Sequence, residues 1–443
     1  MFAHLRLGLL LVLLLAAALP LAAQNPQYFP PTSGTTWAAT TPQSLGWCQP
    51  QLDTLLNYLA SKRTKSLIVL KDGRMVVEQY YGTYTRDSLW YWASAGKSLT
   101  ATLVGIAQQE GLLSLSDSTS KYLGRGWSAA PASKERLITV RHQLSMTTGL
   151  DDTPPPPCDN ETTSAGCLRY LADAGTRWAY HTGPYRLLQD VIARASGLSI
   201  NQYTNQRLAS RIGMSGLWYN DVYYSRARDM ARFGLLILNR GTWEQTPVLS
   251  DAAYFQAMTT PSQAHNRSYG YLWWLNGQQS HMLPTSQLVF NGPMVPTAPT
   301  DMIAALGKND QKIYVVPSLG LVVVRQGQSA GASKLAVSSF DAELWRRLMA
   351  AMQCRPLGSR AGLAAISIEA YPQPAAEQLT VNLPAGLGAC SLQLRNSLGQ
   401  VVQTQASSGS TAHIGLNHLP NGVYVLQVRG SKGQLFATRR IVH

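Results

Sequence analysis

The sequence predicts an α+β domain followed by a small all-β sandwich. Two observations indicate this. Between residues 46 and 354, strand-like patterns at both ends enclose a mostly helical middle. After a short linker, residues 365–443 consist of brief apolar runs separated by Gly, Asn and Pro, the texture of a sandwich of short strands.

The N-terminus has the pattern of an export signal. His4 and Arg6 precede an apolar run that ends in small residues at 21–23, so residues 1–23 are predicted to be a signal peptide. Residues 24–45 are rich in Gln, Pro, Thr and Ser and are expected to be a linker. No later stretch reaches the ~18 apolar residues that span a bilayer. We expect a secreted or cell-surface protein without a transmembrane segment after signal removal.

The domain at 46–354 begins with leucines at helical spacing between 52 and 59. Two apolar runs follow, joined by Asp72–Gly73, a strong hairpin signal. Strand patterns return at 269–276, 313–319 and 321–327, and a helix is expected over 340–352. We therefore expect the two ends to share one antiparallel sheet, flanked by helices, with the helical middle as a subdomain.

Residues 355–364 are expected to be a linker to the C-terminal domain, 365–443. Asn421–Gly422 is a second hairpin signal. The strands expected in this domain lie at 378–383, 390–396, 400–405, 423–428 and 436–442.

The amino-acid composition limits the classes of molecule that this protein is expected to bind. The formal net charge is +14, but Lys and Arg are scattered without a run of four or more, so nucleic-acid binding is not expected. The five cysteines form no CxxC pair and no HExxH motif is present, so neither a metal nor another cofactor is predicted. Cys158 is predicted to pair with Cys167 and Cys48 with Cys354, which leaves Cys390 free.

The stretch ASAGKSLTATLVG at 93–105 carries the main candidate chemistry. A phosphate-binding loop would need Gly five residues before Gly96, where Tyr91 stands. In the alternative interpretation, Ser94 opens a helix and Lys97 lies one turn below its hydroxyl. The helix dipole and burial would lower the Lys97 pKa from about 10.4, so that a neutral amine could take the proton from Ser94. A capping serine followed by a solvated lysine is the structural alternative.

Three ordered segments carry a family resemblance: YWASAGKSLTATLVGIAQQEGLLSLSDSTSKYL at 91–123, ITVRHQLSMTTGL at 138–150, and GTRWAYHTGPYRLLQDVIARASGLS at 175–199. Residues from about 50 to 350 resemble the serine β-lactamase and penicillin-binding protein superfamily. The match is closest to the branch with class C-like lactamases, family VIII esterases, D-aminopeptidases and linear amide hydrolases. The resemblance implies a β-lactamase/transpeptidase-like fold.

The second motif of that superfamily, Tyr-x-Asn, is here Tyr180-His181-Thr182. By resemblance, Tyr180 would move protons between Ser94 and the leaving group, and a neighbouring lysine is expected to lower its pKa. Thr182 stands where an amide would orient substrate and lysine, and its hydroxyl can make fewer contacts. His181 is expected to be structural.

The third motif, Lys-Thr-Gly or His-x-Gly, corresponds to Lys308-Asn309-Asp310. By resemblance, Lys308 would attract a substrate carboxylate or tune the lysine beside the nucleophile. The backbone N–H groups of Gln311 and Ser94 would form the oxyanion hole. Asp310 replaces the glycine that lets a bulky ligand lie against the strand, which argues against efficient binding of β-lactams.

Ser329 is a second candidate nucleophile, because residues 327–331, GQSAG, match the G-x-S-x-G nucleophile elbow. That hydrolase fold requires an acid and then a histidine after the serine. The next histidine is His413, in the C-terminal domain. The segment is therefore predicted to be a turn.

The tail, with a Gly-Gln turn, LPNGVYVLQV and a basic final strand, resembles the C-terminal sorting domain of the type IX secretion system. The resemblance implies the secretion machinery as a partner. A generic β accessory or carbohydrate-binding module is the alternative.

Together these patterns predict an exported serine hydrolase that forms an acyl-enzyme on Ser94, with Lys97 and Tyr180 as proton-transfer groups. The expected substrate is a small ester or amide, including D-amino-acid peptides. The alternatives are a peptidoglycan D,D-peptidase, a β-lactamase, or a non-catalytic surface protein with a penicillin-binding-like fold.

Overall fold

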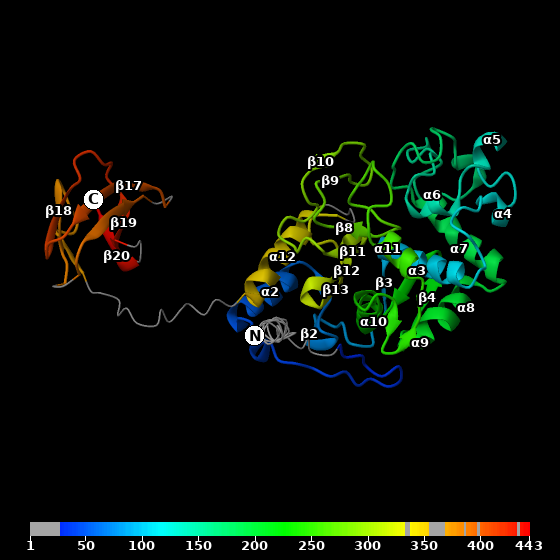
Figure 1. Cartoon of the computed structure of the whole chain (residues 1–443), viewed down its shortest axis with the longest axis horizontal. Coiled ribbons are helices and arrows are strands. Elements are labelled where there is room, and N and C mark those ends of the chain that lie inside the picture. Colours follow the sequence, from blue (N-terminus) through cyan, green and yellow to red (C-terminus); the bar gives the residue numbers. More distant parts are fainter. Residues whose placement is uncertain (1–26, 333–336, 354–367, 385–386, 397–398, 432–434) are drawn as a thin grey trace, which may run out of the picture. The chain divides into compact units, whose positions relative to one another are not determined.

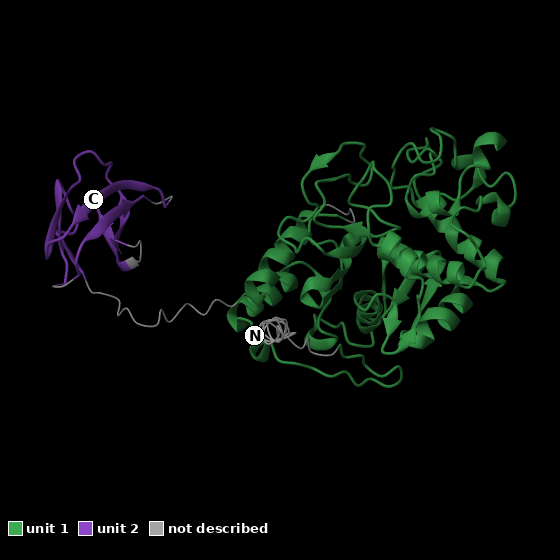
Figure 2. Ribbon diagram, in the orientation of Figure 1, with its two compact units in different colours: residues 1–354 green, residues 355–443 purple. Residues whose placement is uncertain are grey.

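The computed structural model describes residues 27–332, 337–353, 368–384, 387–396, 399–431 and 435–443 (Figure 1). The chain forms two compact units, residues 1–354 and 355–443 (Figure 2), and each is described by itself.

The first unit is built on a six-stranded antiparallel sheet in the order β2-β1-β13-β12-β11-β8. Its strands are β1 (Thr64–Lys71), β2 (Arg74–Tyr80), β8 (Trp274–Leu275), β11 (Ile303–Gly307), β12 (Gln311–Val316) and β13 (Leu321–Gly327). The N-terminal β1 pairs with the C-terminal β13, which confirms the predicted shared sheet. The Asp72–Gly73 hairpin is also confirmed, with φ of +50° and +79°, values that fit a two-residue turn of the primed type.

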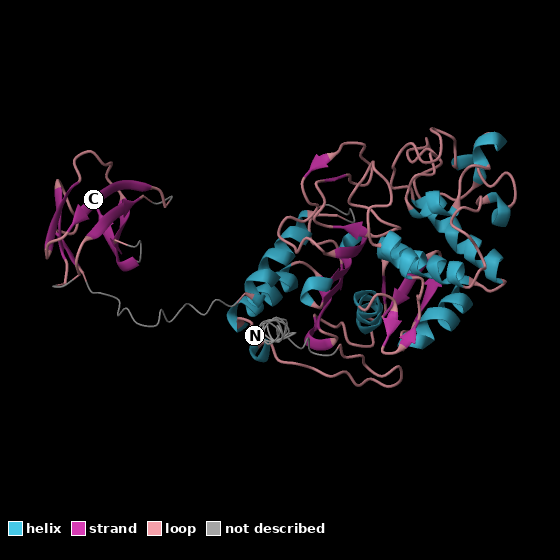
Figure 3. Cartoon of the chain, in the orientation of Figure 1, coloured by secondary structure: helices cyan, strands magenta, loops and turns pink. Residues whose placement is uncertain are grey.

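Helices cover both faces of this sheet (Figure 3). On β12, Tyr314 packs edge-on against Trp345 of α12 (Ser339–Met352), with ring centroids 5.5 Å apart. The next residue toward the N-terminus, Ile313, faces α10 (Ala227–Leu238) on the opposite side. A Cβ at Gly234 of α10 would lie 2.4 Å from the Val322 side chain, so glycine permits this close approach.

The helical subdomain surrounds α3 (Gly96–Gln109), whose residues 96–107 are all buried. A helix that is buried on every side is a central core element. The subdomain also contains α4 (Ser120–Leu123), α5 (Ala132–Glu135), α6 (Val140–Leu144), α7 (Thr182–Ser196), α8 (Ile200–Thr204), α9 (Ser210–Ile212) and α11 (Ala252–Met258). The remaining helix, α2 (Gln49–Ser61), packs against α12.

Short strands complete the first unit. A three-stranded sheet, β3-β5-β4, consists of β3 (Trp90–Tyr91), β5 (Val222–Ser225) and β4 (Gly216–Tyr219). Two small pairs join β6 (Thr242–Trp243) to β7 (Thr246–Pro247), and β9 (Ser280–His281) to β10 (Phe290–Asn291).

The segment expected as a linker is bound to this unit along residues 27–45. Trp37 Nε1 donates to the Gly73 carbonyl at 2.8 Å. Arg232 Nη2 donates to the Pro31 carbonyl at 2.8 Å.

The second unit is all-β. Its two antiparallel sheets are β14-β15-β18 and β17-β16-β19-β20. The strands are β14 (Glu369–Tyr371), β15 (Gln378–Asn382), β16 (Cys390–Arg395), β17 (Val401–Ser407), β18 (Thr411–Gly415), β19 (Val423–Gly430) and β20 (Leu435–Val442). Side chains on β15, β16, β18 and β19 alternate between buried and more exposed, and the buried ones form one apolar core between the sheets.

Two expectations for this unit were wrong. Asn421–Gly422 does not form a hairpin, because the strands around it, β18 and β19, belong to different sheets. The strands β14 and β18 were not predicted, since each is short and polar on one face.

The Cys158–Cys167 disulfide is confirmed, and Cys390 is free and buried as predicted. Cys48 is disulfide-bonded. Its expected partner, Cys354, lies outside the described residues, as does the expected signal peptide, and both remain predictions.

Within the described part of the chain, every helix is too short or too polar to cross a bilayer.

Candidate active site

Ser94 lies in a tight 3-10 turn, Ala93–Ala95, between strand β3 and the buried helix α3. The turn is anchored by Trp92, which is fully buried and donates its indole N–H to Ser225 Oγ at 2.8 Å. Ala93 has a φ of +49°, a left-handed conformation that is costly for a residue with a side chain. The helix starts at Gly96, so Lys97, and not Ser94, lies in its first turn.

The structure brings Ser94, Lys97 and Thr182 together. Lys97 Nζ donates to Ser94 Oγ at 2.9 Å and to Thr182 Oγ1 at 3.3 Å. The lysine is 2% exposed and lies over the rings of Tyr180 and Tyr185, 4.9 and 4.4 Å from their centroids. Sequence reasoning missed Tyr185, because an aromatic residue four positions into a helix usually marks the core.

Burial lowers the pKa of Lys97 to about 7, since the charged form is stripped of water. Among the charged groups nearby, Arg186 and Lys308 lower this pKa further, whereas Glu161 raises it. A neutral amine is therefore present at neutral pH, with Ser94 Oγ within hydrogen-bonding distance. This pair has the geometry of a nucleophile and its base.

The lowered pKa also predicts a pH-dependent stability. In the unfolded chain Lys97 titrates near 10.4, so between pH 7 and about 10.4 the unfolded state binds more protons than the folded state. As the pH increases through this range, the free energy of unfolding of the wild type should therefore rise, relative to that of Lys97→Met, by about 1.4 kcal/mol per pH unit. Urea unfolding of both proteins at several pH values measures this difference. A constant difference from pH 6 to about pH 10 would contradict a neutral lysine in the fold.

Tyr180 is held by a box of aromatic rings. It stacks on Trp274 with centroids 5.7 Å apart and meets Tyr269 edge-on at 6.1 Å. Burial raises the pKa of Tyr180 above its ordinary value, and its contact with the Ser94 hydroxyl only partly offsets this rise. The expected lowering of the Tyr180 pKa was wrong, because loss of water on burial outweighs the hydrogen bond with Ser94. The phenol is protonated at neutral pH and can donate a proton.

Asn160, which sequence reasoning missed, clamps the second motif. Its Nδ2 donates to the Tyr180 carbonyl at 3.0 Å, and its Oδ1 accepts from the Thr182 N–H at 3.0 Å. The Asn160 carbonyl also accepts from the Gly183 N–H at 2.8 Å. Asn160 lies two residues after Cys158, inside the loop that the disulfide closes. The disulfide loop therefore fixes the backbone that carries the phenol and the threonine.

His181 lies at the residue before α7 and is 2% exposed. Burial lowers its pKa to about 4, so it is neutral at physiological pH. Thr139 and His142 cap α6 reciprocally. His142 thus caps a helix, whereas the structural role expected for His181 stays a prediction.

A cavity of about 30 Å³ opens beside Ser94, and its walls include Lys97, Thr182, Tyr185, Arg186, Glu161 and Lys308. Arg186 Nη2 pairs with Glu161 Oε2 at 2.7 Å, and Lys308 Nζ lies 3.6 Å from Glu161 Oε1. Among the four residues expected from the third motif, Lys308 lines this cavity, whereas Asn309, Asp310 and Gln311 do not.

Gly307 is the residue of the β11–β12 hairpin that approaches the nucleophile turn. A Cβ built on it would lie 2.4 Å from the Trp92 carbonyl oxygen and 3.0 Å from the Ala95 nitrogen. Only glycine allows the strand to lie this close to Ser94. The sequence held a signal for this close approach, the glycine directly before Lys308, but the sequence analysis did not use it.

Gln311 begins β12, a strand that contacts the Ala93–Ala95 turn. It is fully buried, it is the ladder partner of Gly307, and its side-chain amide donates to the Gly327 carbonyl at 2.6 Å. The role expected for its backbone N–H in an oxyanion hole stays a prediction.

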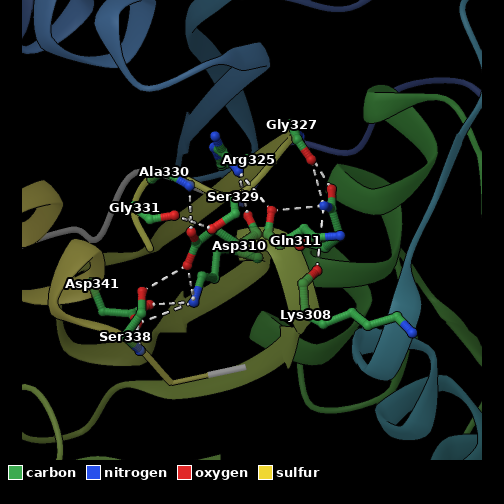
Figure 4. A network of polar contacts seen from close by, with 12 residues as sticks. Lys308, Asp310, Gln311, Arg325, Gly327, Ser329, Ala330, Gly331, Ser338 and Asp341 are labelled. Carbon is green, nitrogen blue, oxygen red and sulfur yellow. Dashed lines mark hydrogen bonds and ion pairs between the residues drawn. The ribbon is translucent and has the colours of Figure 1, made fainter. Parts of the chain in front are cut away.

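Asp310 is buried, and its carboxylate points toward Ala330 and Ser338 (Figure 4). Its carboxylate accepts from Ser338 Oγ at 2.7 Å and pairs with Lys312 Nζ at 3.2 Å. Lys312 also pairs with Asp341 of α12 at 2.9 Å. The side chain therefore ties the hairpin to the N-terminal end of α12, and the expected weak binding of β-lactams stays a prediction.

Ser329, the serine of the G-x-S-x-G match, is 7% exposed and donates its hydroxyl to the Gly331 carbonyl at 2.8 Å. The segment lies at the end of β13 as a bend, in agreement with the predicted turn. Across the described residues, the structure contains no cluster of three or more His, Cys, Asp or Glu side chains suited to a metal ion.

Comparisons with known proteins agree with this geometry. A family model described as beta-lactamase matches residues 58–331, more than half of the chain. A second model, the secretion system C-terminal sorting domain, matches residues 369–443. An uncharacterised protein of Alkalihalophilus pseudofirmus is 22% identical over 309 residues, 60% of this chain and 84% of the relative.

Solved structures share the fold. A protein from Bacteroides dorei assigned as a beta-lactamase superposes with a TM-score of 0.55 at 18% identity, covering 69% of this chain and 99% of its own. One from Bacillus anthracis, assigned as a 6-aminohexanoate-dimer hydrolase, gives 0.55 at 17% identity and covers 73% and 89%. A penicillin-binding protein homologue from Caulobacter crescentus gives 0.51 at 13% identity and covers 69% and 99%.

Proposed function

Since this chain belongs to the beta-lactamase family, with a C-terminal sorting domain of the type IX secretion system, we propose that it is an exported serine hydrolase whose nucleophile is Ser94. The observation that carries the proposal is the 2.9 Å contact between the buried Lys97 amine and the Ser94 hydroxyl. A lysine that titrates near pH 7 is suited to act as a general base there.

In the proposed reaction, neutral Lys97 takes the proton of Ser94 as Oγ attacks the substrate carbonyl, which forms a tetrahedral intermediate and a Lys97 ammonium. Tyr180, whose phenol is protonated, donates its proton to the leaving alcohol or amine. Lys97 returns a proton to Tyr180, and the acyl group remains as an ester on Ser94. Water then attacks this ester with the same groups acting in reverse, which releases the acid and restores the serine.

The substrate class that we propose is a small ester or amide, whose carbonyl could reach the Ser94 hydroxyl in the cavity of about 30 Å³ beside it. Arg186 and Lys308 at its wall would attract a substrate carboxylate, so D-amino-acid peptides fit the charge pattern. Thr182 offers a single hydroxyl where an amide could make several contacts, and this disfavours a β-lactamase.

The sorting domain indicates secretion or attachment at the cell surface. We infer that residues 1–23 act as the signal peptide for the first export step. The catalytic unit would then meet its substrate outside the cytoplasm.

A panel of chromogenic esters, D-peptides and a chromogenic cephalosporin tests the proposal. Turnover of esters or D-peptides with slow cephalosporin hydrolysis is the expected result. Labelling by a fluorescent penicillin would favour a D,D-peptidase. No turnover and no labelling by a fluorophosphonate would indicate a non-catalytic surface protein.

Replacement of Asn160 by alanine should lower kcat about 10- to 100-fold, because the backbone of Tyr180 and Thr182 loses its clamp and small misplacements near the reacting atoms are costly. Steady-state kinetics on a chromogenic ester measure the effect, and KM should change less than kcat. Ser164→Ala, an exposed change in the same disulfide-closed loop, serves as the matched control. Equal kcat in the two variants would contradict the role of Asn160.

A further inference from the structure

A second cavity, which Ser94 does not line, is not used by the proposed reaction. Lys308 lines the cavity beside Ser94, and its neighbour Asn309 lines a larger one of about 350 Å³, a volume within the range of small-molecule sites. Trp90 and Tyr91 form part of its wall. Because consecutive Cα atoms are about 3.8 Å apart, Tyr91 lies at most about 11 Å from Ser94.

The aromatic wall of this cavity has a fixed orientation. Trp90 Nε1 donates to the Gly327 carbonyl at 3.3 Å, and Lys65 Nζ lies 4.5 Å from the centre of the indole ring. Tyr91 OH accepts from Asn309 Nδ2 at 2.8 Å, so the phenol hydrogen remains available to donate. Both rings are half-buried.

The polar wall carries planar hydrogen-bonding groups. Asn309, Gln328 and Arg63 line the cavity, and the Arg63 guanidinium is held by the Ser329 carbonyl. The described lining residues include no carboxylate and a single basic side chain. The GQSAG segment, which is not a nucleophile elbow, thus supplies one side of this cavity.

This combination selects among ligand classes. An apolar acyl chain would offer no hydrogen-bonding partner to the Gln328 amide or to the Arg63 guanidinium. An anionic ligand would meet one cation among the lining residues, Arg63, while Lys65 lies over the indole ring. A sugar ring places its C–H face on an indole and its hydroxyl groups against amides and a guanidinium, so each wall has a partner.

We propose that this cavity binds a neutral saccharide unit of the substrate. The part of this inference that concerns catalysis rests on the proposed function: the sugar would present an attached ester or amide group to Ser94. A strip of rings continues from the cavity, with Tyr91 and Tyr224 6.3 Å apart and Tyr224 and Tyr219 6.4 Å apart. Tyr219 is 62% exposed, so the strip can contact a second sugar ring.

Binding is tested on the full chain with Ser94→Ala, which removes acylation. The indole N–H signals of the ¹⁵N-labelled protein are followed by NMR during titration with cellobiose, maltose or N,N′-diacetylchitobiose to about 50 mM. At least one disaccharide should shift the Trp90 signal, identified by its absence in Trp90→Ala. A blocked alanine tripeptide should not shift it.

Two further variants in the Ser94→Ala background keep the test decisive. Trp90→Ala should weaken disaccharide binding at least about 10-fold, and Gln328→Ala, an exposed change, at least about 5-fold. Phe290→Ala, an exposed aromatic outside the cavity, should leave the affinity unchanged. The inference is overturned if no disaccharide binds, if Gln328→Ala and Trp90→Ala bind as tightly as the parent, or if only the tripeptide binds. Because Ser94 is absent throughout, these outcomes are independent of whether Ser94 is the nucleophile.

Discussion

Replacement of Ser94 by alanine is expected to lower kcat/KM for a chromogenic ester by about 10⁴-fold or more, because the covalent route is removed and only binding contributions remain. Labelling by a fluorophosphonate should disappear at the same time. Steady-state kinetics and intact-protein mass measure the two effects. The fold should survive, since Ser94 lies in a short turn and its hydroxyl is bonded to Lys97 and to no core carbonyl.

Ser98→Ala is the matched control for this change. Ser98 lies in the first turn of α3, which follows the turn that carries Ser94, and its hydroxyl donates to the Leu272 carbonyl at 2.7 Å. Its loss should cost stability of about 1 kcal/mol while turnover stays within a few-fold of wild type. Full labelling of Ser94→Ala, or an adduct mapped to Ser329, would show that the nucleophile lies elsewhere.

Replacement of Lys97 by methionine is expected to lower kcat about 10³-fold, the usual size of a general-base contribution. Methionine keeps the apolar stem and the volume, so KM for a neutral ester should change little. Acylation by a fluorophosphonate should slow by a similar factor, because the reagent also needs a deprotonated Ser94. Lys308→Met should act differently, by raising KM for substrates with a carboxylate. Equal effects of the two lysine changes on kcat would contradict distinct roles for them.

Local sequence patterns were sufficient to predict the strands β1, β2, β12 and β13 and the Ser94–Lys97 pair, but not the strand β11. The Asp72–Gly73 turn and the apolar runs now assigned to β1, β12 and β13 follow from short-range rules. A spacing of three residues across a 3-10 turn that continues into a helix brings a serine and a lysine together wherever the helix lies. Because these features depend on a few residues that are close together in the chain, they could be predicted from the sequence.

The features that sequence reasoning missed depend on contacts between distant segments. Asn160 lies in an irregular loop without periodicity, and its contacts with Tyr180 and Thr182 exist only in the folded chain. The direction of Asp310 depends on α12, which follows it by almost 30 residues, since Ser338 and Lys312 hold its carboxylate. The raised pKa of Tyr180 follows from complete burial among aromatic rings, which a motif does not report.

The buried charges behind the hairpin explain how the chain tolerates an aspartate where the superfamily pattern has glycine. Lys312 pairs with both Asp310 and Asp341. The Arg325 guanidinium, fully buried, donates to the Asn309 and Asp310 carbonyls at 3.0 and 2.9 Å. Asn309 and Asp310 both have φ near +60°. These contacts hold the strained turn and thereby the position of Lys308.

The pH dependence of Ser94 acylation tests the central claim most directly. The rate of single-turnover labelling by a fluorophosphonate should rise with pH and level off, with one apparent pKa of about 7, as Lys97 loses its proton. The labelling rate of the Lys97→Met variant should not show this pH dependence. A wild-type rate that is independent of pH between about 6 and 9, or one that climbs steadily toward pH 10 as for a solvated lysine, would contradict activation of Ser94 by a buried neutral amine.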